Sequence, residues 1–176
     1  GISSFDPPFV ALEPADCVFR INRDTRFSKD KAPYKTNMGA FMTDRGRKVA
    51  RAGYYFHIEP GKYMAGAGLY MFPKEIMDLY RKAVIHEKMG PELEMIIKKV
   101  EQKGYYVGEK KYKRVPRDYP ADHKRGELLK YGGMYAIEEG PIPDWLFTDR
   151  ITEELMKRFN DMKPVQDWML KVLDRS

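Results

Sequence analysis

The stretch RINRDTRFSKDKAPYKT, residues 20–36, gathers six basic side chains around only two carboxylates. A guanidinium group binds a phosphate or carboxylate through two parallel hydrogen bonds, so this pattern predicts a cleft for a small anionic ligand. We expect Asp30 to act there as a catalytic base. The candidate ligand-binding residues in this stretch are Arg20, Arg23, Asp24, Arg26, Lys31 and Lys35. The alternative is a structural network of ion pairs that holds a loop in place.

His57, in the stretch YYFHIEPG, is the best candidate for an acid or base in the chain. The segment reads as a strand, and side chains two residues apart in a strand share a face, so Tyr55 and Glu59 lie beside His57. We therefore add His57 to the candidate catalytic residues and Tyr55 to the candidate ligand-binding residues. The alternative is a histidine that bonds to a neighbouring group and has no chemical role.

A second basic run, residues 98–125, holds ten Lys and Arg residues against four acids. Arg114 and His123 are its candidate ligand-binding residues, and His123 could meet His57 or Asp30 in the folded chain. Aromatic residues alternate with basic ones in GYYVGEKKYKRVPRDY, which is also the pattern of a surface that stacks on bases and contacts phosphates. A nucleic-acid-binding module is therefore an alternative function.

The motifs of several other chemistries are missing from the sequence. It contains no P-loop, no GxGxxG after a strand, no GxSxG elbow and no CxxC or HExxH, so we predict no metal site and find no cofactor indicated. The single cysteine, Cys17, allows no intrachain disulfide and favours a reducing compartment. No apolar run approaches the roughly 18 residues that span a bilayer. We expect a cytoplasmic chain that does not enter a membrane, and the oligomeric state is left open.

The elements that must position these residues begin with a predicted sheet at residues 17–72. Polar and apolar residues alternate over residues 17–27, which predicts a strand, although Arg23 falls on its apolar face. Residues 36–43, 52–59 and 63–72 then predict an antiparallel meander. Glycines inside those strands mark a bulge or a place where another backbone or a ligand comes close. These glycines are Gly39, Gly53, Gly66 and Gly68.

The remainder of the chain predicts mainly helices. Residues 73–103 have helical period and form two helices, whereas residues 104–131 have no sustained period and form a long basic loop. Residues 132–176 provide a returning strand and one or two closing helices around Pro164. With residues 1–16 as an extended lead-in, the whole chain, residues 1–176, predicts a single α+β domain. Its antiparallel meander of about four to five strands is followed and covered by C-terminal helices.

Four blocks, FRINRDTRFSKDKAPYKTNMGAF, GYYFHIEPG, GAGLYMF and KRVPRDYPADHKRGELLK, carry a resemblance to a known family. In order and spacing they resemble the uncharacterised family called domain of unknown function 2461. Members of that family usually begin with an extra helical segment before the stretch at Leu12–Pro14, and we expect this segment to be missing here. The resemblance implies a fold grouping and brings no activity, cofactor or substrate.

Three function classes follow from these observations. The first is a cleft that binds a small phosphate- or carboxylate-bearing ligand, with catalysis left open. The second is a nucleic-acid-binding module. The third is a protein-interaction domain in which the charge network is purely structural. Salt separates the first two, because binding to nucleic acid weakens steeply as salt rises.

Overall fold

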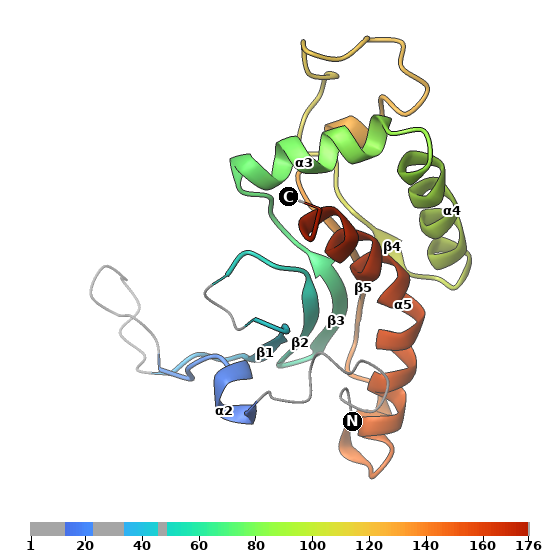
Figure 1. Ribbon diagram of the computed structural model, residues 1–176. Coiled ribbons are helices and arrows are strands. Elements are labelled where there is room, and N and C mark those ends of the chain that lie inside the picture. The colour runs from blue at the N-terminus through green and yellow to red at the C-terminus, as the bar shows by residue number, and fades with distance from the viewer. Residues whose placement is uncertain (1–12, 23–33, 46–48, 176) are drawn as a thin grey trace.

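A computed structural model describes residues 13–22, 34–45 and 49–175 of the chain. Its centre is a five-stranded antiparallel sheet with the strand order β1-β2-β3-β5-β4 (Figure 1). The bounds are β1 Met38–Met42, β2 Gly53–Glu59, β3 Lys62–Leu69, β4 Tyr106–Val107 and β5 Met134–Gly140. The first three strands follow one another as a meander, and the last two join the sheet after two helices. The predicted α+β fold is therefore confirmed.

The register of the strands decides which side chains share a face. Tyr55 of β2 lies opposite Phe41 of β1 and Gly66 of β3, and Gly66 lies in turn opposite Ile137 of β5. Gly61, with φ of 79°, makes the tight turn between β2 and β3. Because a positive φ strains any residue with a Cβ, a glycine suits this turn.

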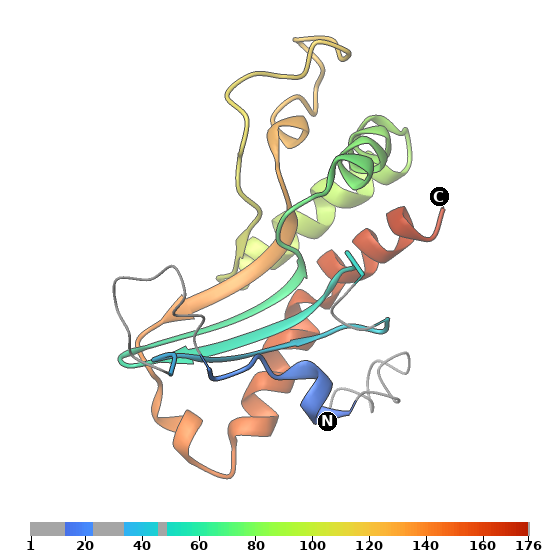
Figure 2. The same ribbon diagram turned by 90° about the vertical axis from the view of Figure 1, so that its left-hand side faces the viewer.

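Three helices lie against one another, and α5 covers one face of the sheet (Figure 2). They are α3 Lys74–Ile85, α4 Met89–Gln102 and α5 Ile151–Leu173, the last of which packs on β3 and β5. α5 continues through Pro164. The sequence allowed one or two closing helices, and the structure has one. Trp168 of α5 is fully buried, and its indole Nε1 donates a hydrogen bond to the carbonyl of Met89 at 3.1 Å.

Alternate residues of the central strands face these helices, and several of them are fully buried. Tyr54, Ala65 and Ala136 have no exposed surface, whereas their neighbours Tyr55, Met64 and Tyr135 are half-buried on the opposite face. This alternation is the expected consequence of the two-residue period of a strand. It leaves the side chains of Tyr55 and His57 on the face of the sheet away from α5.

The predicted strand at residues 17–27 is wrong for the part of it that the structure describes. A short helix, α2 Pro14–Cys17, precedes two isolated bridges, which pair Val18 with Ala40 and Asn22 with Tyr34. The backbone N–H of Phe19 donates to the carbonyl of Gly39 at 2.9 Å, so this segment runs beside β1 without forming a continuous ladder. The alternation of polar and apolar residues thus indicated a segment that lies beside the edge of the sheet, but this segment is not a regular strand.

Candidate functional site

A hollow of about 890 Å³ lies on the face of the sheet away from α5. Side chains of β1, β2, β3, β4 and β5 line it, and the long loop after β4 adds Glu109. Its walls are largely aromatic: Phe41, Tyr55, Tyr70, Tyr106 and Tyr135. We call this feature the aromatic hollow. Its volume lies within the range of pockets that hold small organic molecules.

Glycines form the floor of the aromatic hollow. Gly53 and Gly68 face each other across β2 and β3, and Gly66 lies two residues from Gly68 on the same face. A Cβ at Gly68 would lie 2.4 Å from the carbonyl oxygen of Met134, and φ at Gly68 is +123°. The sheet therefore excludes a side chain there by both backbone geometry and close approach. Without side chains on its floor, the sheet is accessible to a flat molecule.

Two of the wall tyrosines, Tyr55 and Tyr135, hold their protons firmly. Partial burial raises the pKa of Tyr135 to about 12, and the negative charge of Glu109 adds to the effect. Burial also raises the pKa of Tyr55, with a further contribution from Glu59. Because ionisation is disfavoured, these side chains present neutral rings and hydroxyl groups to the hollow.

Tyr55, His57 and Glu59 form a continuous polar row along β2. The Tyr55 hydroxyl lies 3.0 Å from His57 Nδ1, and His57 Nε2 lies 3.6 Å from a carboxylate oxygen of Glu59. The carboxylate favours the tautomer with its proton on Nε2, which leaves Nδ1 to accept the hydroxyl proton of Tyr55. A row of this kind can relay a proton from a bound molecule through the Tyr55 hydroxyl to His57, with Tyr55 neutral before and after the step. Only Tyr55 of the three lines the aromatic hollow.

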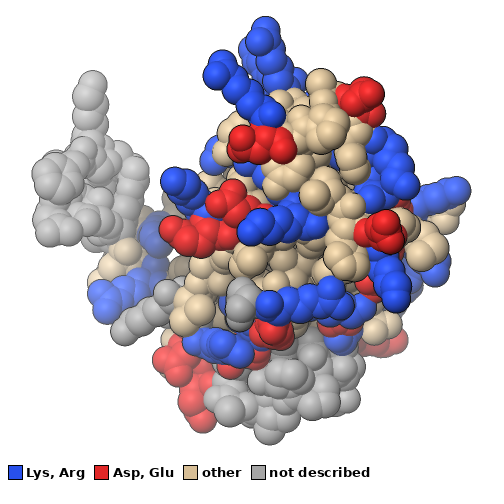
Figure 3. Space-filling view, turned by 45° about the horizontal axis from the view of Figure 1, so that its top comes forward, with Lys and Arg blue, Asp and Glu red and all other residues tan. Residues whose placement is uncertain are grey.

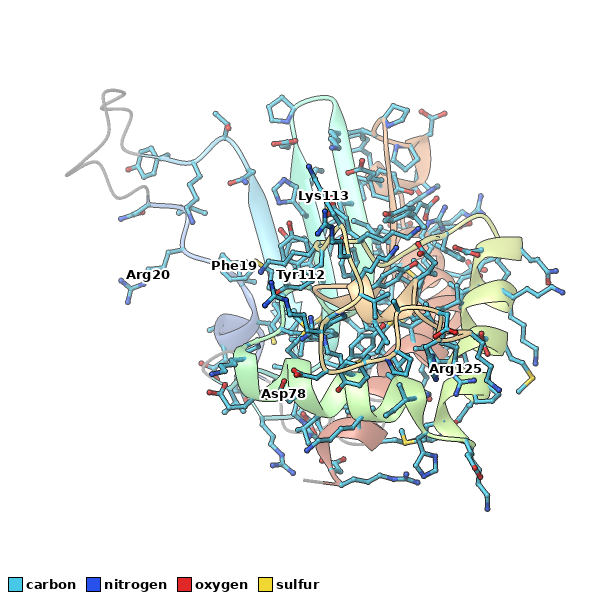
Figure 4. All side chains as sticks on the ribbon, turned by 90° about the horizontal axis from the view of Figure 1, so that it is seen from above. Phe19, Arg20, Asp78, Tyr112, Lys113 and Arg125 are labelled. Atoms are coloured by element: carbon cyan, nitrogen blue, oxygen red, sulfur yellow. The ribbon has the colours of Figure 1, made fainter. Side chains whose placement is uncertain are left out.

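Of the candidate ligand-binding residues in the basic stretch, residues 20–36, the structure describes two, Arg20 and Lys35. Both are exposed, and the Arg20 side chain is directed away from the sheet (Figure 4). Lys35 lines a second, shallower depression of about 370 Å³ with Ile21 and Glu59. Neither residue lines the aromatic hollow. The other candidates of this stretch, Arg23, Asp24, Arg26, Asp30 and Lys31, lie outside the described residues, so their role stays a prediction.

Arg114 and His123 lie in the long loop, which passes above α3 and away from β2 (Figures 1 and 2). His123 Nδ1 accepts a hydrogen bond of 3.1 Å from the backbone N–H of Arg125, so His123 closes a local turn. Arg114 is exposed. Among the described candidates, the structure thus brings Tyr55 and His57 together and leaves the two loop residues at another part of the surface.

Two lysines of this loop are engaged by the protein itself. Lys110 and Lys130 both bind the carboxylate of Glu127 and lower its pKa to about 2. The loop residue Tyr112 in turn contacts α3, where the Arg81 guanidinium lies 5.2 Å from its ring centre. Figure 3 shows acidic side chains interspersed with the basic ones over the described part of this face. The loop therefore carries a mixed surface, in spite of its basic sequence.

Arg125 is a structural residue at the end of this loop. It is 3% exposed, and its Nε and Nη2 donate to the carbonyls of Val84 at 2.6 Å and Ile85 at 3.2 Å. These carbonyls belong to the last turn of α3, where a cation is favoured by the helix dipole. Arg125 thus fastens the long loop to the end of α3, on the side of the molecule opposite Arg20 in Figure 4.

Sequence reasoning missed most of the aromatic hollow. Tyr70, Tyr106, Tyr135 and Glu109 were not among the candidates, although the glycines inside the strands were noted as places of close approach. The available signal was a run of strand glycines with aromatic residues near them. Within the described ranges, no group of three or more His, Cys, Asp or Glu side chains lies close enough to hold a metal ion.

Comparisons with known proteins identify a family and no individual relative. A family model described as conserved hypothetical protein (DUF2461) matches residues 1–168. No curated protein and no solved structure matches the chain. In the described part of the chain, no helix is long and apolar enough to cross a membrane.

Proposed function

The chain belongs to this DUF2461 family, whose description names no activity, and we propose from the geometry that it binds a small, flat molecule in the aromatic hollow. The observation that carries the proposal is the glycine floor beneath tyrosine walls. Aromatic rings prefer to stack at an offset or meet edge to face, and a flat ligand over Gly66 could make both contacts with the walls. Exposed aromatic surface of this kind commonly marks a binding site.

The alternatives have weaker support. Nucleic-acid binding calls for a continuous positive surface, whereas Glu127 engages Lys110 and Lys130, and Arg125 is buried. The predicted anionic ligand relies mainly on residues 23–31, which lie outside the described part of the chain. A protein-interaction role has no single observation in its favour.

Fluorescence titration with a neutral three-ring probe, hydroxymethyl-anthracene, tests the proposal. We expect saturable binding to the unaltered protein. Gly66→Val places a side chain on the floor, where a Cβ lies 3.1 Å from the carbonyl oxygen of Ala136, and should weaken binding about tenfold or more. Tyr106→Ala, which removes a wall residue that is 57% exposed, should weaken binding about fivefold without threatening the fold.

Phe147→Ala is the matched control, because Phe147 is 76% exposed and does not line the hollow. We expect this variant to bind the probe as the unaltered protein does. The proposal fails if the probe does not bind, or if Phe147→Ala weakens binding as much as Tyr106→Ala does. Thermal unfolding of each variant separates loss of binding from loss of structure.

A second candidate function is acid–base catalysis on the bound molecule, which the row of Tyr55, His57 and Glu59 favours. In such a step a ligand O–H or N–H gives its proton to Tyr55 as the tyrosine proton passes to His57 Nδ1, and Glu59 stabilises the imidazolium. Nitrogen NMR of the imidazole ring tests the arrangement. We expect the Nε2–H tautomer in the neutral ring, and a shift toward Nδ1–H in Glu59→Gln. An unaltered spectrum in that variant would remove the support.

A further inference from the structure

We propose that the ligand of the aromatic hollow carries a positively charged amine on a flat ring system, an inference that rests on the proposed function. The first support is the chemistry of the walls. The face of an aromatic ring attracts a cation, and several rings around one space do so together. The hollow provides Phe41 and four tyrosines from four strands and the end of β3.

The second support is the charge of the lining. Among the described residues that line the hollow, three are glutamates and none is Lys, Arg or His. The side chain of Glu138 shares the face of Ala136 toward α5, where Arg158 Nε lies 2.6 Å from its carboxylate, so its charge is not directed into the hollow. Glu139 forms an exposed ion pair of 2.9 Å with Lys62 at the rim.

Glu109 differs from the other two glutamates. It is exposed at the rim, where β4 leads into the long loop, and no described Lys or Arg forms an ion pair with it. Its charge reaches into the hollow, because it contributes to the raised pKa of Tyr135. An amine at this rim would gain an attraction that no described cation already satisfies.

The polar row of β2 agrees with a ligand that donates hydrogen bonds. The Tyr55 hydroxyl donates its hydrogen bond to His57 Nδ1. Its oxygen can therefore only accept a hydrogen bond from a ligand. A protonated amine has only donors, so it can bond to this oxygen, whereas a carboxylate has only acceptors and cannot. Geometry and charge therefore favour the same class of ligand.

Three matched probes test the inference: aminomethyl-anthracene, hydroxymethyl-anthracene and anthracene carboxylate, which share the ring system and differ in charge. We expect the amine to bind about tenfold more tightly than the carboxylate, with the neutral probe between them. Glu109→Gln should weaken binding of the amine about threefold and leave the neutral probe unchanged. Glu87→Gln, which alters an exposed glutamate between α3 and α4, is the matched control and should change neither.

The possible failures are distinguishable. Equal binding of the three probes, or tighter binding of the carboxylate, overturns the charge inference and leaves the proposed function standing if the neutral probe still requires Tyr106. An amine preference that survives unchanged in Glu109→Gln overturns the role of this rim. If no probe binds, both the inference and the proposed function fail.

Discussion

Replacing Arg125 with methionine tests whether this basic residue of the long loop is structural. Methionine retains much of the apolar stem and removes the guanidinium, so the hydrogen bonds to the carbonyls of Val84 and Ile85 are lost. We expect the folded state to lose stability, and the end of α3 and the loop to loosen together. The unaltered chain should show a single higher unfolding temperature.

The magnitude follows from the contacts. Each hydrogen bond to a charged group contributes about 1.5–3 kcal/mol, and a cation at a helix end adds about 0.3–1 kcal/mol. Burial of the guanidinium offsets part of this sum, because Nη1 is buried with no hydrogen-bond partner among the described residues and lies 3.8 Å from Glu94. A net loss of about 3 kcal/mol is expected, which lowers the unfolding temperature by roughly 6–12 °C for a chain of this size.

Differential scanning calorimetry measures this change, with Lys124→Met as the control. Lys124 is the exposed neighbour of Arg125, and its replacement should change stability by no more than about 0.5 kcal/mol. The reasoning is refuted if Arg125→Met unfolds within about 2 °C of the unaltered protein, or if the two variants lose equal stability. Retained stability with lost binding of an anion would instead indicate a functional role for Arg125.

Three further predictions concern the floor, one ion pair and one tyrosine. Gly68→Ala should lower the free energy of unfolding, measured in urea, by at least about 3 kcal/mol. Gly61→Ala is the control, because Gly61 also has a positive φ but nothing lies within 4 Å of a Cβ there, and it should lower the free energy of unfolding by about 1 kcal/mol. Equal losses in the two variants would contradict the close approach at Gly68. Arg51 lowers the pKa of Asp174, so the stability from this pair is present above about pH 4 and is lost as pH falls through the lower folded value. Asp174→Asn should therefore cost roughly 1 kcal/mol at pH 7 and nothing near pH 2 in thermal melts, and a difference that persists in acid would exclude an ionic cause. Tyr135→Phe should remove the component near pH 12 from the tyrosine absorbance titration, because Tyr135 holds its proton up to that pH; an unchanged titration would show that burial does not act on it.

The antiparallel meander and the helix that follows it were predictable, because the residue patterns that indicate them lie within short stretches of the chain. Alternation placed Tyr55, His57 and Glu59 on one face of a strand, and the structure confirms this row. The helical period beginning at Pro73 likewise predicted α3. The glycines inside β2 and β3 indicated a close approach, and the floor of the aromatic hollow lies where Gly53 meets Gly68.

The charge of a stretch predicted the surroundings of its side chains less well than hydrophobic periodicity predicted helices and strands. The sequence around Arg125 is basic, yet the side chain is buried against the end of α3, and Glu127 engages two lysines of the same region. Whether a basic residue faces solvent, a ligand or a carbonyl depends on what packs against it. That information is absent from a single stretch of sequence.

By itself, the sequence determined the α+β class, the first three strands and the side-chain row on β2, because each depends on residues close together in the chain. Tertiary structure decided that β5 inserts beside β3 and that β4 follows it at the edge. Only this long-range pairing brings Tyr106 and Tyr135 to the side of Tyr55. The physical reason is that β5 is stabilised by burial against elements distant in the chain: Met134 and Ala136 are fully buried and α5 packs on β5, contacts that no local period encodes.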